Sequence, residues 1–150
     1  MSQSQRRTIT LLHFSDYHGQ APTFYAEGQL NVAGLARAIA YLRPYADDPN
    51  TLIFNGGDVM SLGHPSWSDK YYYTDWTMFN GIVDAMALGN HDATYGPRVF
   101  EQCQQGIDYP ILSANTCDSQ GNPLFLHDGK NYLVFEMDDL RIGVFGVGWL

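Results

Sequence analysis

The chain has 150 residues, 45% of them hydrophobic and 14% aromatic, which is enough for one globular domain with an apolar core and too few for two. Its net charge of −8 argues against a protein that holds nucleic acid by the phosphate backbone, because that mode needs clustered Lys and Arg. Acidic residues instead suit divalent cations, which can supply positive charge to a phosphate ester. We therefore treat residues 1–150 as one domain with no nucleic acid partner.

The sequence shows no clear targeting signal, membrane helix or disulfide pattern. Cys103 and Cys117 are too isolated to form a metal pair or a disulfide framework, so reduced thiols are expected. Polar residues interrupt the apolar stretch behind Arg6 and Arg7, and no small-residue cleavage site follows, so the chain as written predicts a cytoplasmic protein. No apolar run approaches the roughly 20 residues of a membrane helix, and no membrane partner is expected.

Apolar runs of strand length alternate with segments of helical spacing. The predicted strands span residues 8–14, 51–54, 83–88 and 109–113, and the first reads as buried on both faces. The predicted helices follow a cap at Asn31 and stop before Pro44, cover residues 71–82, and run from Pro97 to Gln105. The runs 132–136 and 140–147 predict an antiparallel hairpin.

This order of elements defines the expected fold class. Strands that alternate with helices predict an α/β fold with a mostly parallel sheet and flanking helices on both faces. The last two runs add a C-terminal β-hairpin. In such sheets, ligands bind at the carboxyl ends of the strands.

Polar side chains follow the first three predicted strands at these carboxyl ends, and they include Asp16, His18, Asp58, Asn90 and His91. Only one residue separates Asp16 from His18, so in extended backbone both would project to the same side and grip one ion. Asp58 could bridge two ions, and Asn90 offers a neutral amide oxygen. This mixture suits Mn²⁺, Fe, Zn²⁺ or Mg²⁺ without choosing among them.

Each motif has an ordinary structural explanation when it is taken alone. Asp and His often cap turns, and a Gly-Asn-His-Asp segment can satisfy backbone groups with its own side chains. Three such motifs at successive strand ends favour a two-metal centre. Two ions about 3.5–4 Å apart can generate a hydroxide near neutral pH and neutralise charge during phosphate-ester hydrolysis.

The motifs also carry a family resemblance. DYHG (16–19), GGD (56–58) and GNHD (89–92), in this order and spacing, resemble the calcineurin-like metallophosphoesterases. More narrowly, LLHFSDYHG, AMALGNHDATYG and ILSANT look like the N-terminal catalytic domain of the 5'-nucleotidase family. The resemblance implies the first half of a metallophosphoesterase sandwich and a role in nucleotide catabolism.

The resemblance implies a role for each residue. Asp16 and His18 would hold the first of two divalent ions, Asp58 would bridge them, and Asn90 would hold the second. His91 would face the substrate phosphate, where it stabilises the transition state or assists the leaving group. A hydroxide between the ions would attack a phosphate monoester, and the family implies a nucleotide.

The chain departs from the 5'-nucleotidase pattern at one residue beside the site. The family reads Gly-Asn-His-Glu-Phe-Asp, and its last Asp partners the catalytic histidine. Thr94 stands at that position here and cannot supply the charge. Asp92 is then the candidate partner of the His91 imidazolium.

The second departure is a missing part. The family completes its metal shells with later histidines and adds a nucleoside-binding domain, and neither occurs in these 150 residues. We therefore expect a truncated chain or one part of a split gene, whose other half could be a separate partner chain. Residues 132–150 are then expected to expose an apolar edge or face.

The other notable side chains favour structural roles. His13, His64 and His127 are expected to be structural or solvent-facing. The aromatic residues between Trp67 and Trp76 could stack on a nucleobase, but core packing is the favoured explanation. Asn115, at the fourth strand end, is expected to satisfy its own turn.

Two other functions stay open. The same scaffold could hydrolyse a sugar nucleotide, a cyclic nucleotide or a sulfur ester. Alternatively, the chain could be an inactive fragment that binds metal weakly or serves as an assembly module. Family members are often periplasmic or extracellular, so the resemblance leaves the location open.

Overall fold

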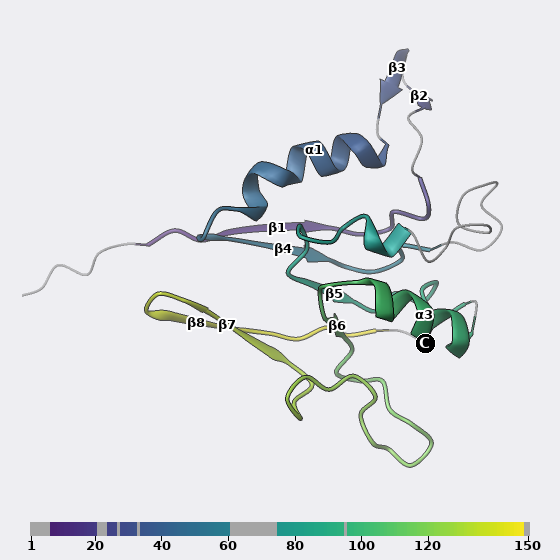
Figure 1. Cartoon of the computed structure of the whole chain (residues 1–150), viewed down its shortest axis with the longest axis vertical. Coiled ribbons are helices and arrows are strands. Elements are labelled where there is room, and N and C mark those ends of the chain that lie inside the picture. The colour runs from purple at the N-terminus through teal and green to yellow at the C-terminus, as the bar shows by residue number, and fades with distance from the viewer. Residues whose placement is uncertain are drawn as a thin grey trace, which may run out of the picture.

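A four-stranded parallel sheet forms the centre of the molecule (Figure 1). A computed structural model describes residues 7–20, 24–26, 28–32, 34–60, 75–94 and 96–148. The sheet has the order β1-β4-β5-β6. Its strands are β1 (Thr10–Phe14), β4 (Thr51–Asn55), β5 (Ala85–Ala87) and β6 (Ile111–Leu112). Each overlaps the apolar run that predicted it, so the predicted parallel sheet is confirmed.

The helices α1 (Leu35–Ala46) and α3 (Pro97–Gly106) accompany the sheet. Pro97 opens α3 as predicted, since proline fixes a helical φ and needs no hydrogen-bond partner there. The predicted start of α1 is wrong, because Asn31 belongs to a small antiparallel pair, β2 (Phe24–Ala26) with β3 (Gln29–Val32). Its predicted end is also wrong.

The helix α1 continues through Pro44 for two more residues. A proline so near the end removes one backbone hydrogen bond without interrupting a longer helix. The Arg43 side chain also fixes this last turn, because its Nη1 donates to the Gly81 carbonyl oxygen at 3.0 Å.

The predicted helix 71–82 is shorter than expected where it is described. The backbone is helical over residues 75–77 and continues in turns to Ile82. Trp76 is fully buried and Phe79 nearly so, which confirms core packing for this tryptophan. Residues 61–74, with His64, Trp67 and the three tyrosines, lie outside the described residues.

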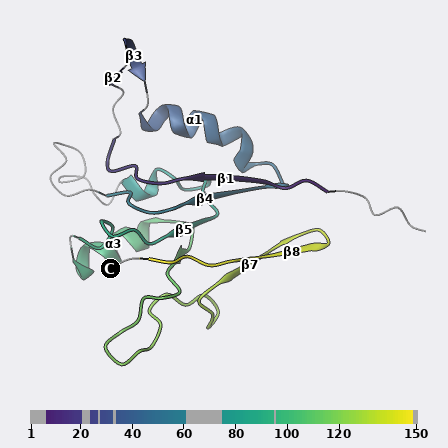
Figure 2. The same ribbon diagram turned by 180° about the vertical axis from the view of Figure 1, so that it is seen from behind.

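A C-terminal hairpin lies beside the sheet. β7 (Leu133–Met137) pairs antiparallel with β8 (Leu140–Val144), as predicted. Figure 2 shows the hairpin extending toward the amino-terminal ends of the sheet strands. There the Arg7 guanidinium donates to the Met137 carbonyl oxygen at 2.8 Å and pairs with Asp138 and Asp139 at 2.8 and 3.0 Å. The hairpin tip is thus tied to the start of the described chain.

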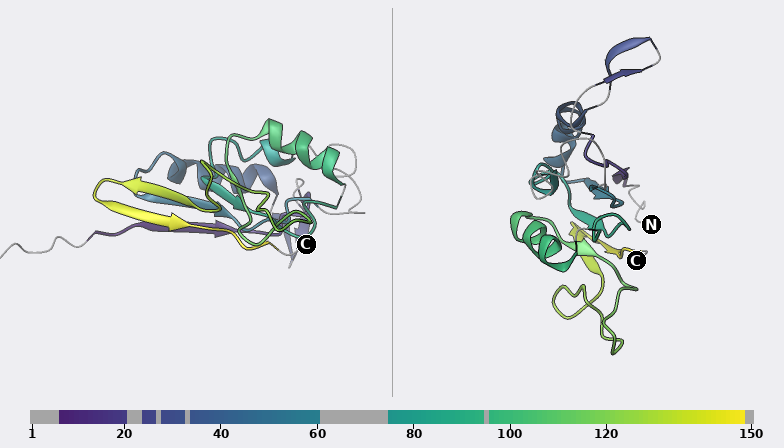
Figure 3. Two further views of the ribbon diagram at one scale, coloured as in Figure 1. Left: turned by 90° about the horizontal axis from the view of Figure 1, so that it is seen from below. Right: turned by 90° about the vertical axis from the view of Figure 1, so that its right-hand side faces the viewer.

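The sheet has one face covered by helices and one more open face. Both helices lie on the same side of the sheet (Figure 3), so the expectation of helices on both faces is wrong for the described residues. On β1, Leu12 and Phe14 pack against the core, whereas Leu11 is 61% exposed. The prediction that β1 is buried on both faces is therefore wrong, since the face that carries Leu11 and His13 is not covered by any of the described helices.

The end of the chain carries exposed apolar side chains, as expected. Tyr132, Leu140, Phe145 and Val147 are 38–66% exposed. Phe135 of β7 approaches the open face of the sheet, where its ring centroid lies 6.1 Å from that of Phe54. No helix in the described part of the chain is long and apolar enough to cross a membrane.

Candidate metal centre

Three predicted ligands meet at the carboxyl ends of β1 and β4. One potential ligand atom from each of Asp16, His18 and Asp58 lies within 4.8 Å of the other two. An ion with ligands at about 2.1 Å holds them at most about 4.2 Å apart, so the three atoms are close to the spacing of a shared cation. Two carboxylates and an imidazole also suit a divalent metal ion chemically.

The backbone at these three residues is left-handed, with φ of 58° at Asp16, 48° at His18 and 55° at Asp58. Such values are uncommon outside glycine and often mark functional sites. The extended backbone expected for Asp16 and His18 is therefore wrong. A tight turn after β1 brings the Asp16 and His18 side chains together. This turn packs against the loop after β4.

Backbone hydrogen bonds hold these two loops together. The Asp16 amide donates to the Gly57 carbonyl oxygen at 3.0 Å, and the His18 amide donates to that of Asp58 at 3.0 Å. The pairing continues the β1–β4 contact beyond the last strand residues, Phe14 and Asn55. The left-handed turns are thus fixed by the surrounding backbone.

The His18 ring is oriented by a backbone contact. Its Nδ1 lies 3.3 Å from the Met60 carbonyl oxygen, which can only accept, so Nδ1 carries the proton. Nε2, on the other side of the ring, lies 3.5 Å from Asp16 Oδ1. Metal-binding histidines commonly use the second ring nitrogen in this way. Ser15 Oγ adds a hydrogen bond to Asp16 Oδ2.

His91 and Asn90 lie in the neighbouring loop after β5. The His91 amide donates to Asp58 Oδ1 at 2.9 Å, and its ring stands edge-on to the His18 ring with centroids 5.1 Å apart. Asn90 is exposed on the same turn. The structure therefore brings the His91 ring beside the three clustered residues, while metal binding by Asn90 stays a prediction.

Two glycines allow the loops after β4 and β5 to touch. A Cβ atom on Gly57 would lie 2.4 Å from the Gly89 nitrogen, and one on Gly89 would lie 2.2 Å from Asp58 Oδ1. Gly57 also has a φ of 97°. The glycines in the GGD and GNHD motifs therefore allow the two loop backbones to approach closely. From the sequence alone, these glycines predict only that the backbone can turn sharply.

Asp92 is buried beneath these loops. Its side chain is 1% exposed, and burial raises its pKa to about 6 against the opposing effect of its hydrogen bonds. Both carboxylate oxygens accept backbone N–H groups, at 2.9–3.3 Å, from Asp58, Val59, Met60 and Gly89. The carboxylate is thus engaged with the backbone, which differs from the expected partnership with the His91 imidazolium.

The remaining candidates have structural roles where they are described. His127 Nε2 donates to the Ile111 carbonyl oxygen at 2.8 Å, which confirms the structural prediction. Asn115 pairs with the Gly148 backbone through both ends of its amide, at 2.6 and 2.9 Å. His13 is exposed on β1, so of the two expected roles, structural or solvent-facing, it has the second. Both cysteines are free.

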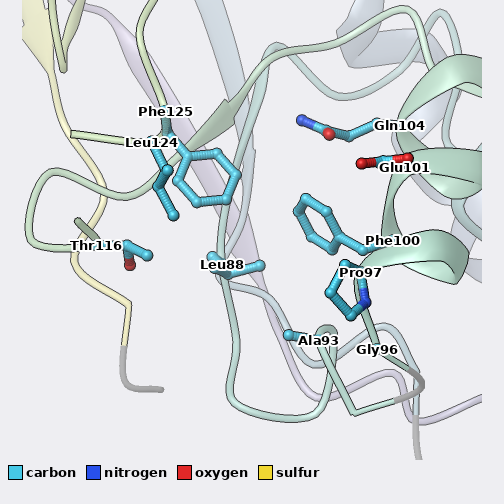
Figure 4. A pocket seen from close by; sticks show the side chains of 10 residues that line it. All are labelled: Leu88, Ala93, Gly96, Pro97, Phe100, Glu101, Gln104, Thr116, Leu124 and Phe125. Carbon is cyan, nitrogen blue, oxygen red and sulfur yellow. The ribbon is translucent and has the colours of Figure 1, made fainter. Parts of the chain in front are cut away.

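A cavity of about 460 Å³ lies beside the GNHD turn, and it was not foreseen from the sequence. Figure 4 shows Phe100 of α3 facing Leu124 and Phe125, with Leu88 between them and Glu101 farther along α3. The Phe100 and Phe125 rings are 5.7 Å apart and perpendicular. The lining is mainly apolar.

The sheet, the loops and the residue cluster agree with the family match. The chain belongs to the calcineurin-like phosphoesterase family, whose pattern it matches over residues 9–145. Within that family, it is related to the N-terminal region of 5'-nucleotidases.

Two curated bacterial relatives define the relationship. The chain is 30% identical to Protein UshA of Escherichia coli over 97% of its own length and 26% of the relative. It is also 30% identical to the 5'-nucleotidase of Vibrio cholerae, over 93% of its length and 25% of the relative. The chain thus spans about a quarter of the length of these relatives.

A solved structure has the same fold. The 5'-nucleotidase precursor of Thermus thermophilus superposes with a TM-score of 0.73 at 27% identity. The match covers 93% of this chain and 28% of that one. The expected fold class, with its parallel sheet, flanking helices and C-terminal hairpin, is therefore confirmed.

Proposed function

We propose that this chain contributes the first part of a metal-dependent phosphomonoester hydrolase site that acts on nucleotides. The observation that carries the proposal is the cluster of Asp16, His18 and Asp58 at one sheet edge, within a calcineurin-like phosphoesterase domain. The 5'-nucleotidases among the relatives support a nucleotide as the substrate. We further propose that residues 1–150 are the N-terminal part of a longer catalytic domain.

The proposed ligands divide between two divalent ions, which are Mn, Zn, Fe or Mg. Asp16 and His18 would hold the first ion, Asp58 would contribute to both, and Asn90 would hold the second. The donor set supports this assignment, because carboxylate, imidazole and amide groups all suit such ions. When bound, such ions supply an activated water and neutralise charge on phosphoryl oxygens.

His91 acts on the substrate. Its ring lies next to that of His18 and is half-buried, so it can meet a phosphate placed at the cluster. As an imidazolium, it donates a hydrogen bond to a phosphoryl oxygen or passes a proton to the leaving alkoxide. The hydrogen bond from the His91 backbone N–H to Asp58 Oδ1 fixes the position of His91 relative to the proposed ligands.

The test is release of phosphate from AMP and from an aryl phosphate, with Mn²⁺ titrated from zero. Asp58→Asn is expected to weaken Mn²⁺ binding by at least about tenfold, and His91→Ala to lower kcat by about 10²–10⁴-fold. Bound Mn²⁺ is followed separately by electron paramagnetic resonance. Turnover that is equal in the wild type and both variants would refute the proposal.

The chain offers a matched control for each variant. Asp128→Asn makes the same change at an exposed residue with a similar φ, 51° against 55° at Asp58. His13→Ala removes an exposed histidine from β1. Both controls are expected to retain wild-type turnover and Mn²⁺ binding.

The same assays decide between the rival functions. Sugar nucleotides, cyclic nucleotides and sulfur esters are offered beside AMP, and the best substrate by kcat/KM identifies the reaction. Binding of Mn²⁺ without any turnover would favour a non-catalytic metal-binding or assembly fragment. A partner chain that supplies further ligands would restore turnover when it is added.

A further inference from the structure

The three loops of the candidate centre are joined by two different kinds of contact. Backbone hydrogen bonds connect the loop after β1 to the loop after β4, including one from Gly19 to the Val59 carbonyl oxygen at 3.1 Å. Side-chain carboxylates connect the loop after β4 to the loop after β5. These carboxylates belong to Asp58 and Asp92.

Asp92 forms most of this second connection. Its carboxylate extends from the loop after β5 and receives three successive amides, those of residues 58–60, from the loop after β4. A fourth bond, from the Gly89 amide, closes the turn of its own loop. Four N–H donors fill the accepting capacity of an ionised carboxylate.

We propose that Asp92 is a positioning residue that sets the distance between the two halves of the candidate centre. One half carries Asp16, His18 and Asp58, and the other carries Asn90 and His91. Asp92 acts through the backbone, since its oxygens are occupied by amide groups. The catalytic meaning of this role rests on the proposed function, whereas the structural role does not.

The chemistry of the contact explains why a carboxylate is needed. An Asn side chain keeps one accepting oxygen but replaces the other with an NH₂ group, which would face N–H donors. Two of the four bonds are lost and like groups oppose each other in a buried site, which is strongly unfavourable. The loops can then relieve this conflict only by moving apart.

The chain contains a matched control at the opposite end of the same strands. Asp84 lies just before β5, and its Oδ2 accepts the Ile53 amide of β4 at 2.7 Å. It therefore also joins β4 to β5 through a carboxylate and a backbone N–H. Burial raises the pKa of Asp84 as well. Asp84→Asn should cost stability without moving the loops of the centre.

The test measures the geometry of the metal-free chain by NMR. The His18 and His91 rings, 5.1 Å apart, are expected to give a nuclear Overhauser cross-peak in the wild type and in Asp84→Asn. Asp92→Asn is expected to lose this cross-peak while its β-sheet amides stay protected from exchange. An unchanged cross-peak in Asp92→Asn, or its equal loss in Asp84→Asn, would overturn the proposal.

A second variant covers the case in which Asp92→Asn does not fold. Asp92→Glu keeps both oxygens but carries them one methylene farther, so it is expected to fold with a weakened cross-peak. A wild-type cross-peak in a folded Asp92→Glu would then count against a positioning role. Mn²⁺ binding adds a second readout, with an expected loss of about 10–100-fold in Asp92 variants and none in Asp84→Asn.

These outcomes separate the two proposals. If the wild-type chain shows no phosphatase turnover, either alone or with an added partner chain that supplies further ligands, the proposed function fails, but the cross-peak still tests the role of Asp92. If turnover is present and the Asp92 variants keep both the cross-peak and the affinity, only the positioning role fails.

Discussion

Asp16, His18 and Asp58 combine reactive side chains with left-handed backbone. A left-handed φ costs an L-residue about 1–2 kcal/mol, although Asp tolerates it better than most residues. Three such residues within one cluster are sustained by the backbone bonds between their loops. The residue types of the cluster could be predicted from the sequence, but these conformations could not, because they depend on contacts about 40 positions away.

Gly89 should not tolerate a side chain. Gly89→Ala would place a Cβ atom 2.2 Å from Asp58 Oδ1, so we expect a loss of about 1–3 kcal/mol in unfolding free energy, as for other overpacked sites. Urea denaturation followed by circular dichroism measures this loss. Gly143→Ala is the control, since no atom lies within 4 Å of its added Cβ. Equal midpoints for the two variants would contradict the prediction.

The two cysteines should differ sharply in reactivity. Cys103 is fully buried, and burial raises the pKa of its thiol to about 12, so the reactive thiolate is scarce near neutral pH. Cys117 is exposed. A disulfide reagent at pH 8 should label one thiol quickly and the second only after denaturant is added. Rapid labelling of both thiols in the folded chain would refute the assignment.

The role of Asp92 shows what a residue motif leaves out. The GNHD motif places Asp92 next to His91, and this adjacency suggests an electrostatic partnership between the two side chains. Three of the four hydrogen bonds of Asp92 instead come from residues 32–34 positions earlier in the chain. Nothing in the local pattern encodes that direction, because it follows from how β4 and β5 pack.

At the level of elements, long apolar strands and a proline-started helix were predictable. The residues at which these elements begin and end, and the elements that they contact, were less predictable. The helical spacing after Asn31 is genuine, but its first residues join the β2–β3 pair, and the helix begins only after Gly34. Here tertiary pairing overrides a local cap signal.

The segment after β8 is held by the Asn115 side chain, whose amide group donates and accepts hydrogen bonds as a backbone residue would. Gly146 accepts the Ala114 amide at 2.8 Å, and Asn115 then pairs with Gly148 at both ends of its amide group. Residues 146–148 therefore run beside the end of β6. This arrangement makes Asn115 an anchor for the last described segment.

Asn115→Ala should release this segment locally. Each lost hydrogen bond is worth about 1 kcal/mol, so amide exchange at Gly148 is expected to accelerate roughly tenfold or more. Hydrogen exchange followed by NMR measures the rate. Asn122→Ala is the control, because the Asn122 side chain donates to Asp118 within its own loop. Unchanged exchange at Gly148 would show that Asn115 is dispensable.

For the molecule as a whole, the candidate centre concentrates negative charge in a chain of net charge −8. A cation that binds only the folded state stabilises it by mass action. At a free concentration one hundred times its Kd, this amounts to about 2.7 kcal/mol. The thermal stability of the chain should therefore depend on divalent metal.

Thermal denaturation with and without Mn²⁺ tests this dependence. We expect Mn²⁺ to raise the Tm of the wild type and of Asp128→Asn, and a chelator to reverse the increase. Asp58→Asn should show little or no increase, because one shared carboxylate is missing. If Mn²⁺ leaves the Tm of the wild type unchanged, this would argue against a metal site in the folded chain.

The open face of the sheet is a property that only the assembled molecule reveals. Apolar runs identify strands, but they do not show which strand forms an edge or which face receives the helices. Leu11 and Phe54 belong to runs that read as fully buried, yet Leu11 is largely exposed and Phe54 is only partly buried. The missing information is which face of the sheet the helices cover, and the sequence pattern does not contain it.

The ties of Arg7 to the hairpin tip also bear on the order of folding. Its guanidinium meets Met137 and Asp139, about 130 positions later in the chain. During synthesis, these ties to the hairpin tip can form only after nearly the whole of this sequence has been made, whereas the bond from Arg7 to Asn50 Oδ1 can form earlier. Contacts of such long sequence separation form slowly. The bonds between Arg7 and the hairpin tip are thus expected to be among the last contacts of this chain to form.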